Sequence, residues 1–244
     1  MRNVIVTGGS RGLGLAITTQ LAGAGYRVIA VARKITDELM AARDAAAAAG
    51  LGAIEFRALD LSDIVGIAPF VRALRAEVGP FYGLVNNAGL GTGGVLANLR
   101  DADIERLIRL NTLSPIVLAK YASKSMMLER AGRIINISSI VASTGYSGLS
   151  VYSASKASLL GFTYSLAREL GQLGITVNAI APGYINTDMT EELTDTQREQ
   201  IARRSALKRM ADPIDVARSV EYLIGEAGRN ITGTVLTVDA GNTA

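Results

Sequence analysis

The chain has 244 residues, of which 49% are hydrophobic and 19% charged, with 26 glycines and 5 prolines. This composition excludes a disordered chain and favours one large folded domain over residues 1–244. The chain contains no cysteine, histidine or tryptophan. Catalysis by serine or cysteine paired with histidine, thiol redox chemistry and the common zinc and iron–sulfur sites are therefore excluded, and we expect no metal site. Acid–base chemistry falls to tyrosine, lysine, aspartate or glutamate.

The charges do not indicate a nucleic acid partner. The 25 lysines and arginines and the 22 aspartates and glutamates give a net charge of +3, and the basic residues are scattered along the chain. No apolar stretch approaches the ~20 residues that span a membrane, and the first residues lack a signal-peptide pattern. We expect a cytoplasmic protein that binds neither nucleic acid nor a membrane.

Short apolar runs alternate with longer segments of helical periodicity from end to end. Seven runs are predicted strands: Val4–Thr7, Arg27–Val31, Ala53–Leu59, Gly83–Asn86, Arg133–Ser138, Thr176–Ile180 and Val235–Val238. Six segments are predicted helices: Leu13–Ala24, Asp37–Ala49, Ile64–Val78, Asp103–Glu129, Tyr152–Leu170 and Pro213–Glu226. The alternation predicts a single α/β domain in which a seven-stranded parallel sheet lies between two layers of helices.

The two longest predicted helices, Asp103–Glu129 and Tyr152–Leu170, exceed the length that covers one face of a sheet. Both carry apolar or small residues on more than one side. Two interpretations stay open for them: contact with another subunit, or deep burial within the domain.

A glycine-rich turn with the sequence TGGSRGLG, at residues 7–14, joins the first strand to the first helix. Glycines permit a tight turn and a close approach of the backbone, and the free N–H groups at the start of the helix attract a pyrophosphate. This context predicts a dinucleotide. The alternative is that Gly8, Gly12 and Gly14 only allow the strand and helix to lie close together.

Further motifs follow in order: NNAG at residues 86–89, Asn111, Ser139, YSASK at residues 152–156, and Pro182-Gly183. With the TGxxxGxG turn they span residues 7–187 and resemble the short-chain dehydrogenases/reductases. The resemblance implies a Rossmann-type, doubly wound sheet and an oxidoreductase with a nicotinamide cofactor. It also implies a set of cofactor contacts: Gly8, Ser10, Arg11, Gly12, Leu13, Gly14, Arg33, Asp60, Leu61, Asn87, Ala88, Gly89, Tyr152, Lys156, Pro182, Gly183, Ile185 and Thr187.

The end of the second strand predicts which cofactor is bound. An acidic side chain there would hydrogen-bond the adenosine ribose and repel a phosphate, but Ala32 stands at about that position. Arg33 and Arg11 provide cations for a phosphate, so NADP(H) is favoured over NAD(H). Alternatively, Arg33 and Lys34 are solvated charges at a strand end. For Asp60, the alternative to an adenine contact is a role as N-cap of the following helix.

Tyr152 and Lys156 are four residues apart, so they share one face of a helix. A neighbouring ammonium lowers the pKa of a tyrosine, which makes this pair the expected acid–base device. The resemblance implies that Tyr152 donates a proton to the carbonyl oxygen and that Ser139 hydrogen-bonds the same oxygen. It further implies that Lys156 holds the nicotinamide ribose and Asn111 anchors a water. Ser138 is expected to support the backbone.

The later half of the chain resembles the branch of this family that reduces 3-oxoacyl thioesters on acyl carrier protein in fatty acid biosynthesis, and Arg130 matches one of its carrier-binding basic positions. Two features depart from that branch: Leu173 stands at the second basic position, and residues 90–94 lack its Thr-Arg-Asp pattern. The resemblance implies NADPH-dependent reduction of a 3-oxoacyl thioester, on acyl carrier protein or CoA, by a homotetramer. The alternatives are an NADP-dependent alcohol dehydrogenase or ketoreductase of a sugar, cyclic alcohol or polyketide, and, more remotely, a non-catalytic nucleotide-sensing protein.

Residues 187–210 follow the predicted cofactor segment and mix apolar with polar side chains, so we expect a lid over the substrate. Four basic residues of this segment either meet an anionic carrier or form a solvated face: Arg203, Arg204, Lys208 and Arg209.

Overall fold

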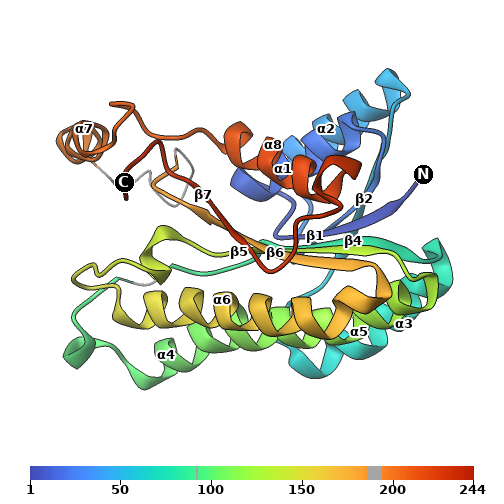
Figure 1. Ribbon diagram of the computed structural model, residues 1–244, viewed down its shortest axis with the longest axis horizontal. Coiled ribbons are helices and arrows are strands. Elements are labelled where there is room, and N and C mark those ends of the chain that lie inside the picture. Colours follow the sequence, from blue (N-terminus) through green and yellow to red (C-terminus); the bar gives the residue numbers. More distant parts are fainter. Residues whose placement is uncertain (92, 186–193) are drawn as a thin grey trace.

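The computed structural model describes residues 1–91, 93–185 and 194–244 and has the predicted three layers (Figure 1). A seven-stranded sheet with the order β3-β2-β1-β4-β5-β6-β7 lies in the middle, and every neighbouring pair is parallel. The strands are β1 (Asn3–Thr7), β2 (Arg27–Ala32), β3 (Ala53–Ala58), β4 (Phe81–Asn86), β5 (Gly132–Ile137), β6 (Ile175–Pro182) and β7 (Val235–Val238). All seven predicted strands are confirmed, and their ends differ from the prediction by one or two residues.

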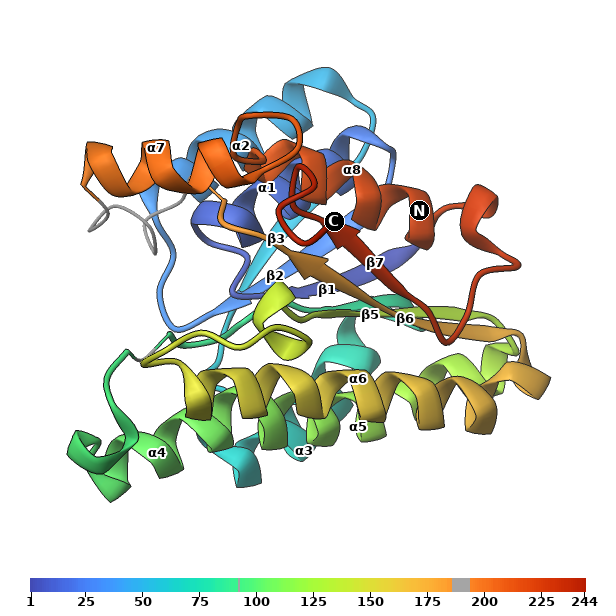
Figure 2. The same cartoon turned by 60° about the vertical axis from the view of Figure 1, so that its left-hand side comes forward.

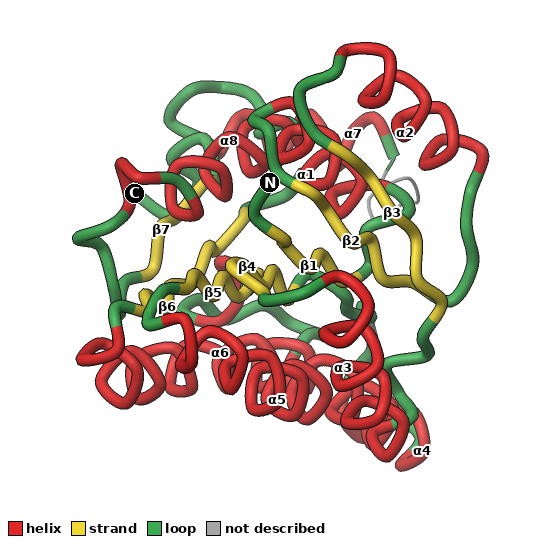
Figure 3. Tube along the Cα trace, turned by 90° about the vertical axis from the view of Figure 1, so that its right-hand side faces the viewer, coloured by secondary structure: helices red, strands yellow, loops and turns green. Residues whose placement is uncertain are grey.

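The helices cover the two faces of the sheet unequally. One face carries α1 (Gly12–Gly23), α2 (Asp37–Ala49) and α8 (Pro213–Ile224), and the other carries α3 (Ile64–Val78), α4 (Asp101–Ile108), α5 (Ser114–Glu129) and α6 (Ser150–Leu170) (Figures 1 and 3). α7 (Asp195–Arg204) stands apart, at the edge where the strands end (Figure 2). Among the described residues, no helix is both long and apolar enough to cross a membrane.

The core follows from strands that are apolar on both sides. In β1, Val4 and Val6 pack in the cluster beneath α1 and α8, whereas Ile5 packs in the cluster against α3 and α5. Because successive side chains of a strand point to opposite faces, a continuous apolar run fills both interfaces at once. All three side chains are fully buried.

The predicted helix Asp103–Glu129 is not continuous. α4 ends at Ile108, a π-helical turn covers Arg109–Leu113, and α5 begins at Ser114. Pro115 has no N–H to donate to the carbonyl of Asn111 four residues earlier, so regular α-helical bonding cannot run through this point. The proline was the signal in the sequence for this interruption.

The two long helices are not buried on all sides. α5 exposes Leu128, and α6 exposes Tyr164, while the opposite sides of both helices pack on the sheet. The interpretation that these helices are deeply buried is therefore wrong for this chain. Their outer faces remain open in the single subunit.

α7 lies within the predicted lid, although the prediction contained no helix there. A capping box formed by Thr194 and Gln197 begins the helix, and none of its residues is buried. A helix without an apolar face leaves no periodic pattern in the sequence, which explains why it was missed. Residues 187–193 of the predicted lid lie outside the described residues.

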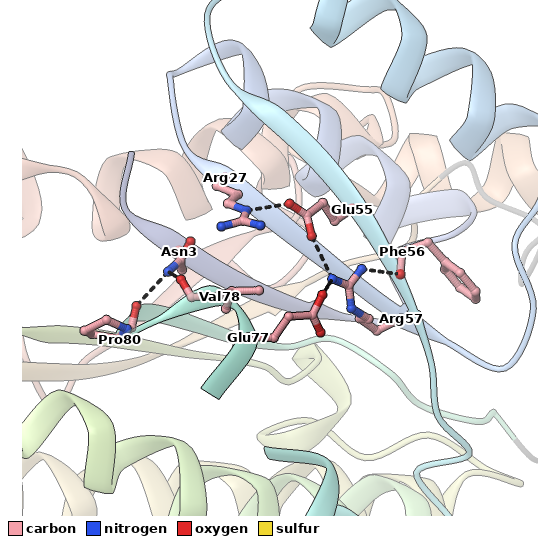
Figure 4. A network of polar contacts seen from close by, with 8 residues as sticks. All are labelled: Asn3, Arg27, Glu55, Phe56, Arg57, Glu77, Val78 and Pro80. Carbon is pink, nitrogen blue, oxygen red and sulfur yellow. Dashed lines mark hydrogen bonds and ion pairs between the residues drawn. The ribbon is translucent and has the colours of Figure 1, made fainter. Parts of the chain in front are cut away.

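Polar side chains on β1, β2 and β3 form a network of hydrogen bonds and ion pairs with one another and with the end of α3 (Figure 4). The side-chain amide of Asn3 donates to the carbonyls of Val78 (2.8 Å) and Pro80 (2.9 Å), which ties β1 to the turn between α3 and β4. Glu55 pairs with Arg27 and Arg57 near the surface. These three side chains are half-buried, and ion pairs near the surface contribute about 1 kcal/mol or less each, whereas leaving a buried amide without its hydrogen bonds costs about 1–3 kcal/mol.

Candidate functional site

The predicted site residues gather where the parallel strands end. The sheet order reverses direction at β1, which lies between β2 and β4, and in such sheets ligands bind in the crevice at this reversal. The glycine turn follows β1, the NNAG segment follows β4, and Ser139 and Pro182 stand at the ends of β5 and β6.

The glycine turn has the backbone that the sequence predicts. Gly8 and Gly12 adopt positive φ angles of 64° and 52°. A Cβ on Gly14 would lie 2.0 Å from the carbonyl oxygen of Gly8, whereas a Cβ on Gly12 would meet no heavy atom within 4 Å. Close strand–helix contact therefore explains Gly14 but not Gly12, which opens toward the space in front of α1.

The start of α1 suits an anion. Arg11, at the N-cap, makes no side-chain cap, and the first turn holds no acidic residue. The first turn of α1 thus places no carboxylate of its own beside these N–H groups. The turn is held from behind by Thr36, whose hydroxyl donates to the carbonyl of Ser10 (2.6 Å). Leu13, in the first turn of α1, packs against the core.

A threonine hydroxyl joins the ends of β1 and β4. Thr7 Oγ1 accepts hydrogen bonds from the backbone N–H groups of Asn87 and Ala88, both at 2.9 Å, and donates to the carbonyl of Val85 at 3.3 Å. The side-chain amide of Asn87 donates to the carbonyl of Thr7 (2.9 Å). Asn87 and Ala88 were predicted site residues, whereas Thr7 was not, although it opens the glycine motif.

The predicted adenosine end holds Arg33 and Asp60. Asp60 Oδ1 accepts from the N–H (2.9 Å) and hydroxyl (2.6 Å) of Ser62. These hydrogen bonds, followed by the positive charges of Arg33 and Arg106, lower the pKa of Asp60. Asp63, not Asp60, caps α3, so the N-cap alternative for Asp60 is wrong.

The side chains of three further predicted contacts differ in exposure. Leu61 is buried in the core, which leaves only its backbone for the predicted contact. Arg11 and Arg33 are both exposed, one in the glycine turn and one after β2. Ala32 ends β2, so the described chain has no carboxylate at that strand end.

Tyr152, Ser139 and Lys156 come together between β5 and α6. The hydroxyl groups of Tyr152 and Ser139 are hydrogen-bonded to one another. The Lys156 ammonium lies 5.8 Å from the centre of the Tyr152 ring and donates to the carbonyl of Ile137 at 2.9 Å. Ser138 Oγ donates to the carbonyl of Lys156 (2.9 Å), so Ser138 supports the backbone as predicted.

The prediction that the Lys156 ammonium lowers the pKa of Tyr152 is wrong for this structure. Burial raises the pKa of Tyr152, and the hydrogen bond with Ser139 offsets this only in part. Burial also lowers the pKa of Lys156 to about 8. The ammonium is bound to the carbonyl of Ile137, and desolvation by burial is the largest influence on the pKa of Tyr152.

Asn111 lies in the π-helical turn and is almost fully buried. Its side chain accepts from the N–H of Leu90 and donates to the carbonyl of Leu90, both at 2.8 Å. It also donates to Ser155 Oγ (3.2 Å), which in turn donates to the carbonyl of Tyr152 (2.7 Å). Asn111 therefore links the loop after β4 to the first turns of α6.

Gly89 keeps the space between the two buried polar groups open. A Cβ at this position would lie 3.3 Å from Asn111 Oδ1 and 3.4 Å from Lys156 Nζ. The water that the resemblance implies for Asn111 stays a prediction. In the structure the Asn111 side chain hydrogen-bonds the backbone of Leu90.

The segment after β6 meets the end of the chain. The N–H of Gly183 donates to the carbonyl of Val238 (3.0 Å), and Ile185 forms a β-bridge with Ala211. Pro182 is the last residue of β6. Thr187, also predicted to contact the cofactor, lies outside the described residues.

The predicted carrier-binding residues lie on two different surfaces. Arg130 follows α5 with a φ of 49° and donates to the carbonyl of Gln172 (3.1 Å), next to Leu173. In the lid, Lys208 donates to the carbonyl of Arg203 (2.9 Å). Arg203 pairs with Glu199 (3.4 Å), and both basic side chains therefore have partners in their own segment.

Comparison with known proteins gives one consistent result. Residues 2–198 match the family described as short chain dehydrogenase. The 3-oxoacyl-[acyl-carrier-protein] reductase FabG of Escherichia coli is 39% identical over 97% of this chain and 95% of that protein, and the FabG of Staphylococcus aureus is 33% identical over 98% and 97%. A short chain dehydrogenase from Burkholderia cenocepacia in complex with NADP has a TM-score of 0.90 and 35% identity, covering 100% of this chain and 98% of that one. A short-chain dehydrogenase/reductase from Serratia marcescens has a TM-score of 0.91 and 33% identity, with the same coverage.

The buried Lys156 makes stability depend on pH. An unfolded lysine keeps its proton to a pH of about 10.5, whereas Lys156 in the folded protein keeps it only to about 8. Between these values the unfolded state binds more protons, so this group makes the free energy of unfolding rise with pH. Urea unfolding between about pH 7 and about pH 10.5 is expected to show this rise in the wild type but not in Lys156→Met. The exposed Lys124→Met should keep the wild-type slope; equal slopes in all three proteins would contradict the burial of the ammonium.

Proposed function

The chain belongs to the short-chain dehydrogenase/reductase family, and from this premise we propose that it is an NADPH-dependent reductase of 3-oxoacyl thioesters. The product is the 3-hydroxyacyl thioester, formed on acyl carrier protein or CoA. The observation that carries the proposal is the Ser139–Tyr152 hydrogen bond beside the buried Lys156, in a chain that is 39% identical to a FabG reductase over 97% of its length.

The residues at the end of β1 and β2 fit a phosphorylated dinucleotide. Gly8 and Gly12 give the turn its left-handed backbone, and α1 begins without an acidic residue. Ala32 leaves room where a carboxylate would repel a phosphate, and Arg33 is exposed next to it. NADPH supplies the hydride that reduces the carbonyl carbon.

The chain itself supplies the proton and the orientation. The Tyr152 hydroxyl donates its proton to the carbonyl oxygen as the oxygen becomes an alcohol. The Ser139 hydroxyl, which already hydrogen-bonds Tyr152, hydrogen-bonds the same oxygen and holds it in line with that proton. Because burial raises the pKa of Tyr152, the tyrosine stays protonated at neutral pH, which suits a proton donor in reduction.

Lys156 has two roles in this proposal. Its ammonium binds the ribose hydroxyls on the nicotinamide side, and its charge stabilises the tyrosinate that remains after proton transfer. A pKa of about 8 keeps the ammonium mostly protonated near neutral pH. Asn111 positions Tyr152 through Ser155, because Ser155 bonds both the Asn111 amide and the Tyr152 carbonyl.

A second candidate is an NADP-dependent ketoreductase of a non-acyl substrate, such as a sugar, a cyclic alcohol or a polyketide. Leu173 favours it, because it replaces a basic residue of the carrier-binding surface and lies beside an Arg130 that is held by Gln172. A non-catalytic nucleotide-sensing protein is disfavoured, because Tyr152 and Lys156 are both retained and lie together.

We also propose that four copies assemble and that residues 187–210 close over the substrate. α5 and α6 run side by side on the outer surface and expose Leu128 and Tyr164, of which 69% and 49% are accessible (Figures 1 and 2). Burying these apolar side chains against another copy would remove them from water.

Light scattering is expected to give a mass about four times that of the single chain, and Tyr164→Glu is expected to lower this mass.

NADPH oxidation tests the reaction directly. Acetoacetyl-CoA, the same acyl group on acyl carrier protein, and a panel of cyclic ketones and keto-sugars are offered in parallel, with NADH as the control cofactor. Turnover of the thioesters supports the proposal, and faster turnover of the carrier-bound one identifies the carrier protein as a partner. Activity confined to the cyclic ketones or keto-sugars would contradict the thioester proposal and support the ketoreductase of a non-acyl substrate.

Tyr152→Phe removes only the proton donor. We expect turnover to fall by about 10²–10⁴-fold, while NADPH binding, followed by the fluorescence of the bound cofactor, stays nearly unchanged. Tyr222→Phe, on the exposed side of α8, is the matched control and is expected to keep full activity. Full activity of Tyr152→Phe would exclude the mechanism.

Arg33→Asp tests the phosphate site. A lost charge-assisted hydrogen bond and a new repulsion are expected to raise the KM for NADPH by at least about tenfold and to leave the KM for NADH within about twofold. Arg43→Asp, on the exposed side of α2, serves as the control for a general change in charge. If both cofactors respond alike to Arg33→Asp, the assigned phosphate contact is wrong.

A further inference from the structure

The end of the chain folds around one carboxylate. Asp239 follows β7 and is 9% exposed. Its Oδ1 accepts from the N–H of Gly241 (2.8 Å), and its Oδ2 accepts from the N–H (2.9 Å) and hydroxyl (2.7 Å) of Thr243. The turn that results contains two left-handed residues, Ala240 with φ 56° and Gly241 with φ 75°. A non-glycine residue in this conformation is strained, so the turn depends on the hydrogen bonds to Asp239.

This turn holds the end of α7. The carbonyl of Gly241 accepts from the N–H of Ala206 (3.2 Å), and that of Ala240 accepts from the N–H of Leu207 (3.0 Å). The two segments lie so close that a Cβ on Gly241 would be 2.6 Å from the Cβ of Ala206. Asn242 adds a longer contact of 3.4 Å to Ser205 Oγ, at the C-cap of α7.

This contact matters for the placement of α7 because the helix has no buried face. None of its residues is buried, so no apolar face fixes it to the core. Figures 1 and 2 show the helix beyond the carboxyl ends of the strands. The hydrogen bonds of Ala206 and Leu207 to the tail thus anchor the described part of the lid.

The same tail meets two segments that border the reacting centre. A Cβ on Gly183, after β6, would lie 2.6 Å from the Cβ of Asp239. The Tyr146 hydroxyl, on the segment between Ser139 and Tyr152, donates to Asn242 Oδ1 at a long 3.5 Å. The rings of Tyr146 and Tyr184 pack edge to face, 6.0 Å apart at 75°.

We propose that Asp239 is a positioning residue for substrate binding. Its carboxylate folds residues 239–243 into the turn that holds α7 on one side and Tyr146 with Tyr184 on the other. Tyr146 lies on the segment between Ser139 and Tyr152, and Tyr184 lies on the segment after β6, so the tail joins α7 to the two segments that follow β5 and β6. Asp239 touches no reacting atom and acts through the tail. The inference rests on the proposed function, since it requires a carbonyl substrate beside Tyr152.

Three variants test the inference by steady-state kinetics. Asp239→Ala removes all three hydrogen bonds and is expected to raise the KM for the carbonyl substrate at least about tenfold, with kcat changed less and the KM for NADPH within about twofold. Asp239→Asn keeps one acceptor oxygen but replaces the other with an NH2 donor, so it is expected to restore only part of the loss. Asp44→Ala, at an exposed aspartate of α2, is the matched control and should match the wild type.

Hydrogen exchange provides a measurement that does not need activity. The amides of α7, Ala206 and Leu207 are expected to exchange faster in Asp239→Ala than in the wild type, and at an intermediate rate in Asp239→Asn. Thermal unfolding shows that the compared variants are folded. If the wild type reduces no carbonyl compound, the proposed function fails, yet the exchange rates still test the anchor.

Two results would overturn the positioning role. One is unchanged exchange in α7 together with an unchanged substrate KM in Asp239→Ala. The other is a rise in the KM for NADPH as large as that for the carbonyl substrate, because the tail would then act on the cofactor segment through Gly183.

Discussion

The site depends on the hydrogen bonds that fasten the end of β1 to the end of β4. Thr7 Oγ1 accepts from two successive N–H groups after β4, and the Asn87 amide returns a bond to the Thr7 carbonyl. Between these ends the sheet order reverses, so the bonds set the crevice in which the glycine turn faces the NNAG segment. The close approach of Gly14 to Gly8, which excludes even a methyl group, follows from the same constraint.

A protein without histidine must perform acid–base chemistry with groups that titrate far from neutrality. In this chain burial moves the two partners in opposite directions: the pKa of Tyr152 rises, and that of Lys156 falls to about 8. In the proposed reduction, the tyrosine is thereby kept protonated as the donor, while the lysine retains its charge near neutral pH. Two hydrogen bonds between the end of β5 and α6 hold this arrangement in place. The Lys156 ammonium donates to the carbonyl of Ile137, and the Ser138 hydroxyl donates to the carbonyl of Lys156.

Two helical segments depart from regular helices packed on the core. The π-helical turn directs Asn111 toward Leu90 and Ser155, and it occurs where Pro115 interrupts regular bonding. α7 is a helix without a buried face, placed by its ends rather than by the core. The first connects the loop after β4 to α6, and the second is held by the chain terminus, so neither would be expected from helix propensity alone.

Period and spacing in the sequence determined the sheet, the seven strands, the three layers and most helices, because a strand buried on both faces must be apolar at every position. They also located the glycine turn, Asn87, Ser139, Tyr152 and Lys156 through local motifs. Only the tertiary structure decided the direction of the tyrosine pKa, the hydrogen bonds of Thr7 and Asp239, the π-helical turn and α7. Each of these depends on groups that are distant in the chain, on burial or on the absence of an apolar face, and none of them leaves a local pattern in the sequence.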